Sequence, residues 1–234
     1  MPRRPSRTRR LVTASSWPVG IALTSWAYMW RITPLHRREL AGSMERDAPP
    51  SLPPDASRQE AQLSEAGVGP LYHRRYQALI VEPELSAEEL MSRLAGDLNQ
   101  AAPREFARFT KVLGDDASME AGDEYVVRMP GPWDGPVRVV ARTPTSFRFL
   151  TLDSHLEAGQ IEFRVTSEDG GLRFTIESWA RSGDELSRIM YHRLHMAKEV
   201  QFHMWTSFLE RVVRIAGGRL QGGIDAETRI VDDE

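Results

Sequence analysis

The chain has 234 residues, of which 41% are hydrophobic, 8% aromatic and 27% charged, and these proportions are typical of a globular protein rather than a disordered or fibrous one. Its formal net charge of -3 and its lack of a motif with interleaved basic and aromatic residues argue against nucleic-acid binding. The absence of cysteine excludes disulfides, thiolate metal ligands and cysteine nucleophiles, and it agrees with a cytoplasmic location.

An N-terminal arm and a proline-rich linker are expected over residues 1–66. The arm begins with five arginines in residues 1–10, and the apolar run after them is interrupted by serine, threonine and proline and lacks a cleavage signal. Neither a signal peptide nor a transmembrane span is therefore expected. We favour docking of residues 26–35 on the main domain, and contact of the arm with an anionic membrane is the alternative. Four prolines in residues 48–56 predict a stiff linker.

A strand and a short helix are expected next. Residues 75–82, RYQALIVE, are apolar and rich in β-forming residues. Ser86 and Glu89 then form an S-x-x-E capping box, which is typical of a helix start, and Pro103 closes the helix. The apolar stripe of this helix consists of Leu90, Leu94 and Leu98.

A meander of strands is expected from Arg104 onward. There the periodicity changes to two, and turn signals divide the chain into about six extended segments. Within them apolar and polar residues alternate, as Phe163 and Val165 do with Glu162 and Arg164. One face of the predicted antiparallel sheet should therefore form the core and the other should face water.

A long amphipathic helix is expected to begin at a second capping box, Ser182 and Glu185, and to end at Gly217 and Gly218. Its apolar face comprises Leu186, Met190, Ala197, Met204, Phe208 and Ile215.

This order of elements resembles the helix-grip fold of START-like and pollen-allergen-like proteins. The expected fold class is α+β, with a curved antiparallel sheet of about six to seven strands packed on the long C-terminal helix and a short helix after the first strand. The helix-grip domain is expected over residues 67–220, and an acidic C-terminal tail over residues 221–234.

Four strings in this domain are distinctive: GVGPLYHRR at residues 67–75, GDEY at 122–125, TLDSHLEAGQIEF at 151–163 and SWARS at 178–182. They resemble the uncharacterised family called domain of unknown function 1990, and the likeness is most specific in the pattern T-L-x-x-H-x-E-x-G-x-x-x-F. The resemblance implies no established activity.

The loop with His155, Glu157 and Glu162 is the best candidate for acid–base chemistry, because a carboxylate can tune a histidine that titrates near neutral pH. The alternative is a structural loop closed by a histidine hydrogen bond, with Gly159 relieving the backbone. No residue is assigned as catalytic. An enzyme of the cyclase or hydrolase type that uses His155 and a carboxylate is retained as an alternative function, and whether the protein is an enzyme stays open.

Four residues of the long helix, His192, His195, Glu199 and His203, have the three- or four-residue spacing found in metal sites. The helix lacks the H-E-x-x-H pattern and an evident fourth ligand, so we expect these residues on a solvated face. Neither a metal nor a cofactor is predicted.

The leading hypothesis is a binder of a hydrophobic or amphipathic small molecule. Arg193 and Gln201 lie beside the apolar stripe of the long helix, where each needs a partner from the sheet, a water or a ligand. A cavity between helix and sheet would be lined by these two residues and by Tyr125, Phe147, Phe163, Phe174 and Met204. A third hypothesis is a protein- or membrane-interaction module that uses the N-terminal arm and a hairpin around Trp133.

Overall fold

The computed structural model describes residues 33–104, 106–128, 134–183 and 196–232. The predictions for most of the N-terminal arm and for Trp133 lie outside these residues. The described strands are β1 (Leu35–Ala41), β2 (Val68–Val81), β3 (Arg108–Leu113), β4 (Glu124–Arg128), β5 (Asp134–Thr143), β6 (Ser146–Thr151), β7 (Glu157–Glu168), β8 (Gly171–Ser182) and β9 (Arg219–Val231). The described helices are α2 (Met44–Asp47), α3 (Ala87–Gly96) and α5 (Met196–Ile215), with short 3-10 helices at Ser64–Ala66 and Leu98–Gln100.

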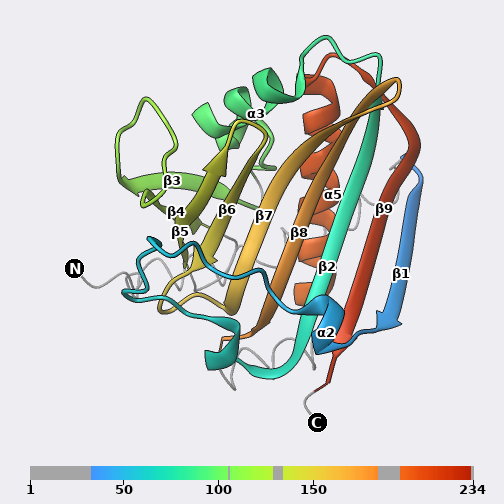
Figure 1. Cartoon of the computed structure of the whole chain (residues 1–234). Helices are drawn as coiled ribbons and strands as arrows, with labels where there is room; N and C mark the ends of the chain where they lie inside the picture. Colours follow the sequence, from blue (N-terminus) through green and yellow to red (C-terminus); the bar gives the residue numbers. More distant parts are fainter. Residues whose placement is uncertain (1–32, 105, 129–133, 184–195, 233–234) are drawn as a thin grey trace, which may run out of the picture.

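The expected α+β helix-grip architecture is confirmed. Strands β3 to β8 form the predicted antiparallel meander, and β2 pairs antiparallel with β8. Helix α5 lies along one face of this curved sheet, which we call the inner face, and α3 covers one end of the sheet (Figure 1). The strand that was expected at residues 75–82 begins earlier, at Val68.

The sheet is larger than expected, with nine strands in the order β1-β9-β2-β8-β7-β6-β5-β4-β3. Most of the segment that we had expected to be an acidic tail is strand β9, which pairs antiparallel with β2 and parallel with β1. Its apolar residues explain the difference, because Ile224 and Ala226 are buried in the main core. The acidic residues Asp225 and Glu227 alternate with them and are only partly buried, so β9 is a half-buried strand.

Aromatic side chains join α5 to the sheet. Phe208 of α5 lies 5.5 Å from the ring of Phe163 and 6.3 Å from that of Phe174, measured between centroids. Full burial of such side chains stabilises a fold by about 1.5 to 3 kcal/mol each. The helix ends as predicted, with Gly217 in the left-handed region at φ +71°. Glu185 of the expected capping box lies outside the described residues, so the start of this helix stays a prediction.

The capping box of α3 is confirmed. Ser86 Oγ accepts a hydrogen bond from the Glu89 backbone N–H at 3.2 Å, and Glu89 Oε2 accepts one from the Ser86 N–H at 2.8 Å. We expect Ser86→Ala to lower the free energy of unfolding by about 1 kcal/mol, because an N–H at the helix start loses its partner. Urea denaturation would measure this, and Ser92→Ala in the same helix is the control, with no expected loss.

The proline-rich segment is bound to the sheet rather than acting as a free linker. Residues 48–62, which we call the outer strap, cross the face opposite α5 (Figure 1). Proline has no N–H, so this segment cannot donate regularly to a neighbouring strand. Instead, its carbonyls accept hydrogen bonds from side chains of the sheet. Gln160 donates to the Pro50 carbonyl at 3.0 Å, and Arg138 donates to the carbonyls of Ser57 and Gln59 at 3.2 and 2.7 Å. The strap therefore marks the outer face of the sheet.

Candidate functional site

Polar side chains gather at one end of the inner face. Tyr72 and Arg74 project from β2, Ser178 from β8 and Glu157 from β7, and Gln201 of α5 meets them. Arg74 and Ser178 are register partners, so their side chains share a face. We call these five residues the polar end of the inner face.

A buried ion pair organises this polar end. Arg74 Nη1 donates to Glu157 Oε1 at 3.1 Å, and Gln201 Nε2 donates to Glu157 Oε2 at 3.1 Å. The Arg74 guanidinium also lies 4.6 Å from the centroid of the Tyr72 ring. Because Arg74 is only 4% exposed, its charge needs this compensation. Gln201 thus has the sheet partner that its position on the helical wheel required.

Two hydroxyl groups add neutral hydrogen-bonding capacity to this region. Ser178 is 4% exposed, and its Oγ has no hydrogen-bond partner within the described part of the chain. Tyr76, the next inward residue of β2 after Arg74, is buried, and burial raises the pKa of its phenol to about 12. The phenol therefore stays protonated at physiological pH. The region can hold a polar group, but Tyr76 cannot act there as a base.

The aromatic residues that were expected to line a cavity lie in the main core. Phe147, Phe163 and Phe174 are fully buried. Phe147 stacks on Phe163 at 4.8 Å, and Phe163 meets the edge of Trp205 at 5.5 Å. Tyr125 and Met204 belong to the same core cluster. These five predicted residues thus lie together, while Gln201 lies at the polar end and Arg193 is outside the described residues.

The loop around His155 is closed by backbone contacts. Its Nδ1 accepts a hydrogen bond from the Glu157 backbone N–H at 2.9 Å, and burial lowers the pKa of His155, which favours this neutral, accepting form. The Glu157 carboxylate points to Arg74, whereas Glu162 lies near Arg164 at 3.5 Å. Glu162 alternates with the buried Phe163, so it faces away from α5. The three residues are therefore not gathered around one point.

The prediction that His203 lies on a solvated face of the helix is wrong. This residue is 8% exposed and meets the ring of Phe106 edge-on at 5.1 Å. Residues before β3 cover that side of α5, where Arg211 donates to the Ala102 carbonyl at 2.6 Å. Glu199 pairs with Arg37 at 2.6 Å. His192 and His195 lie outside the described residues, within which no group of potential metal ligands occurs.

Sequence reasoning missed a second buried cluster, on the outer face. His73 Nδ1 lies 2.8 Å from Asp47 Oδ1, and His73 Nε2 lies 2.8 Å from Glu177 Oε1. Burial disfavours the charged forms, but the hydrogen bonds to Glu177 and Asp47 outweigh it, so the pKa of His73 is raised and the pKa values of both carboxyls are lowered. The Trp179 ring stacks on His73 at 5.2 Å. The cluster ties helix α2 to the sheet.

Among the described residues, no helix has both the length and the apolar composition needed to cross a lipid bilayer.

Comparison with known proteins gave one family and several structures. The family model described as "Domain of unknown function (DUF1990)" matches residues 60–211. No curated protein matches the chain significantly.

Three of the solved structures that match illustrate the likeness. Protein TTHA0849 of Thermus thermophilus has a TM-score of 0.47 at 14% identity, over 62% of this chain and 96% of that one. Ginseng major latex-like protein 151 of Panax ginseng has a TM-score of 0.45 at 11% identity, over 62% and 98%. The di-domain ARO/CYC StfQ from the steffimycin biosynthetic pathway has a TM-score of 0.45 at 10% identity, over 66% of this chain. The match spans 52% of the length of StfQ.

Proposed function

Because the chain belongs to the family described as Domain of unknown function (DUF1990), which carries no activity in its description, we propose a function from its own residues: it binds an amphipathic small molecule at the polar end of the inner face. The observation that supports this proposal most directly is a polar group of residues buried beneath α5, beside an otherwise apolar face. Buried polar groups are costly unless they are paired, and ligand sites combine apolar walls with a few polar anchors.

The charge balance of the polar end indicates which head group fits. Arg74 and Glu157 neutralise each other. The hydroxyl of Ser178 has no hydrogen-bond partner among the described residues, and the nearby phenol of Tyr76 stays protonated and neutral. A neutral oxygen-bearing group, such as a hydroxyl, ketone or ester, therefore suits the site better than a free charge.

The neighbouring residues provide the apolar part of the site. Tyr76 and Ala78 follow Arg74 along the inner face of β2, and Phe202 of α5 lies 6.3 Å from the Tyr76 ring. All three are at most 5% exposed. A ligand with its oxygen atoms near Ser178 would direct its hydrocarbon part toward these residues.

Native mass spectrometry of freshly purified protein, together with fluorescence titration of the neutral amphiphile 6-dodecanoyl-2-dimethylaminonaphthalene, tests the proposal. We expect a retained small molecule or saturable binding of one probe per chain. Gln201→Leu should weaken probe binding by about three- to tenfold, because it removes the hydrogen bond of about 0.5 to 1.5 kcal/mol that holds the Glu157 carboxylate in the polar end. The Arg74–Glu157 ion pair stays in place in this variant.

Gln160→Leu is the matched control, because Gln160 is a buried glutamine of the outer face. Probe binding should be unchanged in it. A protein that carries no ligand and gives no saturable binding would contradict the proposal. Equal weakening by the two substitutions would also contradict it, since the probe would then not distinguish the two faces.

A further inference from the structure

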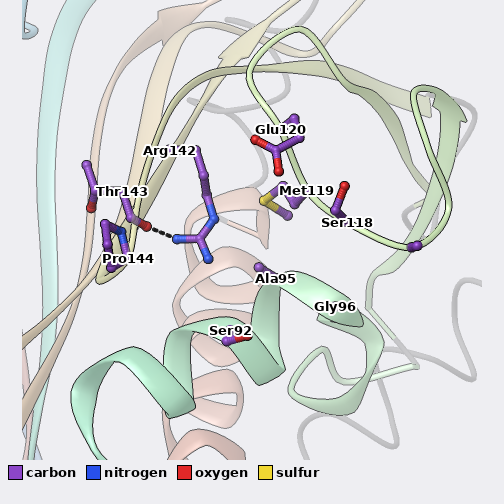
Figure 2. Close-up of a pocket in the computed structure, with 10 residues that line it drawn as sticks. Ser92, Ala95, Gly96, Ser118, Met119, Glu120, Arg142, Thr143 and Pro144 are labelled. Atoms are coloured by element: carbon purple, nitrogen blue, oxygen red, sulfur yellow. Dashed lines mark hydrogen bonds between the residues drawn. The ribbon is translucent and has the colours of Figure 1, made fainter.

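A cleft lies at the end of the sheet opposite the polar end, beside α3. It has a volume of about 420 Å³ and lies between the second half of α3, residues 117–120 and the hairpin that joins β5 to β6 (Figure 2). Its size falls in the range of small-molecule sites, roughly 300 to 1,000 Å³. The lining residues that matter below are Ser92, Ala95, Gly96, Ser118, Glu120 and Arg142.

The guanidinium group of Arg142 projects into this cleft. Arg142 extends from β5 toward α3, as Figure 2 shows, and its Nη1 donates to the carbonyls of Thr143 and Ser146, the latter at 3.0 Å. Within the described ranges no carboxylate lies at ion-pair distance from it. Partial burial lowers the pKa of Arg142, against the opposing charge of Glu120. A half-buried guanidinium that makes no direct ion pair with a carboxylate attracts an anionic group.

The cleft also has a negative side. Glu120 lies on the loop wall, exposed and close enough to act electrostatically on Arg142 without pairing with it. The C-terminal end of α3, at Ala95 and Gly96, adds the partial negative charge of a helix terminus. Ser92 and Ser118 contribute hydroxyl groups to the lining. A cation is thus favoured beside Glu120 and an anion beside Arg142.

We propose that this cleft binds a small zwitterion, a free amino acid, with its carboxylate on Arg142 and its ammonium group facing Glu120 and the C-terminal end of α3. A single anion would satisfy Arg142 but would meet repulsion from Glu120. The zwitterion spans the two opposite charges and keeps the net charge of the cleft unchanged. This site lies away from the polar end of the inner face and does not rest on the function proposed for that end.

Isothermal titration calorimetry of the full chain with each of the twenty standard L-amino acids tests this inference. We expect at least one of them to bind saturably, and its N-acetyl derivative and its carboxamide, which each lack one charge, to bind at least about tenfold more weakly. A charge-assisted hydrogen bond is worth about 1.5 to 3 kcal/mol, so Arg142→Gln should weaken binding by about tenfold or more. Glu120→Gln should weaken it less, because Glu120 is exposed to solvent.

Arg142 also supports the β5–β6 turn, so a variant that leaves the turn intact is needed. Ser92→Leu fills the cleft from α3 at an exposed position and should abolish binding without lowering the melting temperature. The absence of binding for every amino acid at millimolar concentration would overturn the proposal. Unchanged binding by Arg142→Gln or Ser92→Leu, or equal binding of the N-acetyl derivative, would overturn it as well.

Discussion

His73→Leu is expected to lower the free energy of unfolding by about 3 kcal/mol, because it leaves two buried carboxylates without their shared partner. Asp47 is 1% exposed and Glu177 is 9% exposed. Both His73 ring nitrogens lie 2.8 Å from carboxylate oxygens, and carboxylates only accept hydrogen bonds, so both nitrogens must donate. Below its raised pKa, the ring is therefore an imidazolium cation in the folded protein.

This stabilisation should depend on pH. Since the folded pKa of His73 is raised above its ordinary value of 6.5, its contribution is fully present below pH 6.5 and is lost as the pH rises through the raised value. The pKa values of Asp47 and Glu177 are lowered from 3.8 and 4.5, so their contributions are lost only as the pH falls through the lowered values. The cluster should therefore stabilise the fold most between pH 4.5 and 6.5.

Urea denaturation of the wild type and of His73→Leu at several pH values would measure both effects. The difference in unfolding free energy should shrink as the pH rises above about 6.5, because the unfolded chain then releases the His73 proton while the folded wild type still holds it. His36→Leu is the matched control, since His36 is exposed and its effect should be within about 0.5 kcal/mol. A difference that stays constant up to about pH 9 would show that His73 is not charged in the fold.

Phe163→Ala is expected to cost about 3 to 5 kcal/mol of unfolding free energy, because the surrounding core cannot close around the lost ring. Phe163 is fully buried and lies within 5.5 Å of the ring centroids of Phe147, Trp205 and Phe208. Those rings belong to the sheet and to α5, so the cavity would open at the contact between them.

Guanidinium denaturation would measure the loss, with Phe163→Leu as the conservative comparison at about 1.5 kcal/mol or less. The pair of variants also separates two roles for this side chain. A residue that lines an open cavity loses less on truncation than a residue that is packed on all sides. A cost below about 1 kcal/mol for Phe163→Ala would therefore favour the cavity-lining role over core packing.

Local patterns were enough to predict much of the fold. The two-residue alternation in β7 and β8 and the capping box at Ser86 are signals within one segment, and the structure has the strands and the helix that they predicted. Strand β9 was missed because Gly222 and Gly223 interrupt its alternation and its acidic residues resemble a tail. Its partners β1 and β2 lie far away in the sequence, and no local pattern indicates such pairing.

The candidate sites were harder to predict from the sequence, because their residues also come from segments that lie far apart in the chain. The helical wheel indicated that Gln201 needs a partner, but only the fold identifies Glu157, which is 44 residues away. The cluster around His73 joins Asp47, which is 26 residues away, and Glu177, which is 104 residues away. In the sequence, Arg142 does not differ from an arginine on the solvated face of a strand. Only the fold shows that α3 lies beside it.

The pairing of β1 with β9 has a consequence for synthesis of the protein. A ribosome makes residues 35–41 well before residues 219–231, yet β1 pairs with β9 along its whole length, from Leu35 with Ile224 to Ala41 with Ile230. This edge of the sheet can therefore assemble only after β9 has emerged. Until then, one edge of β2 offers unpaired backbone groups to other nascent chains, and closing so long a loop should make this final step slow.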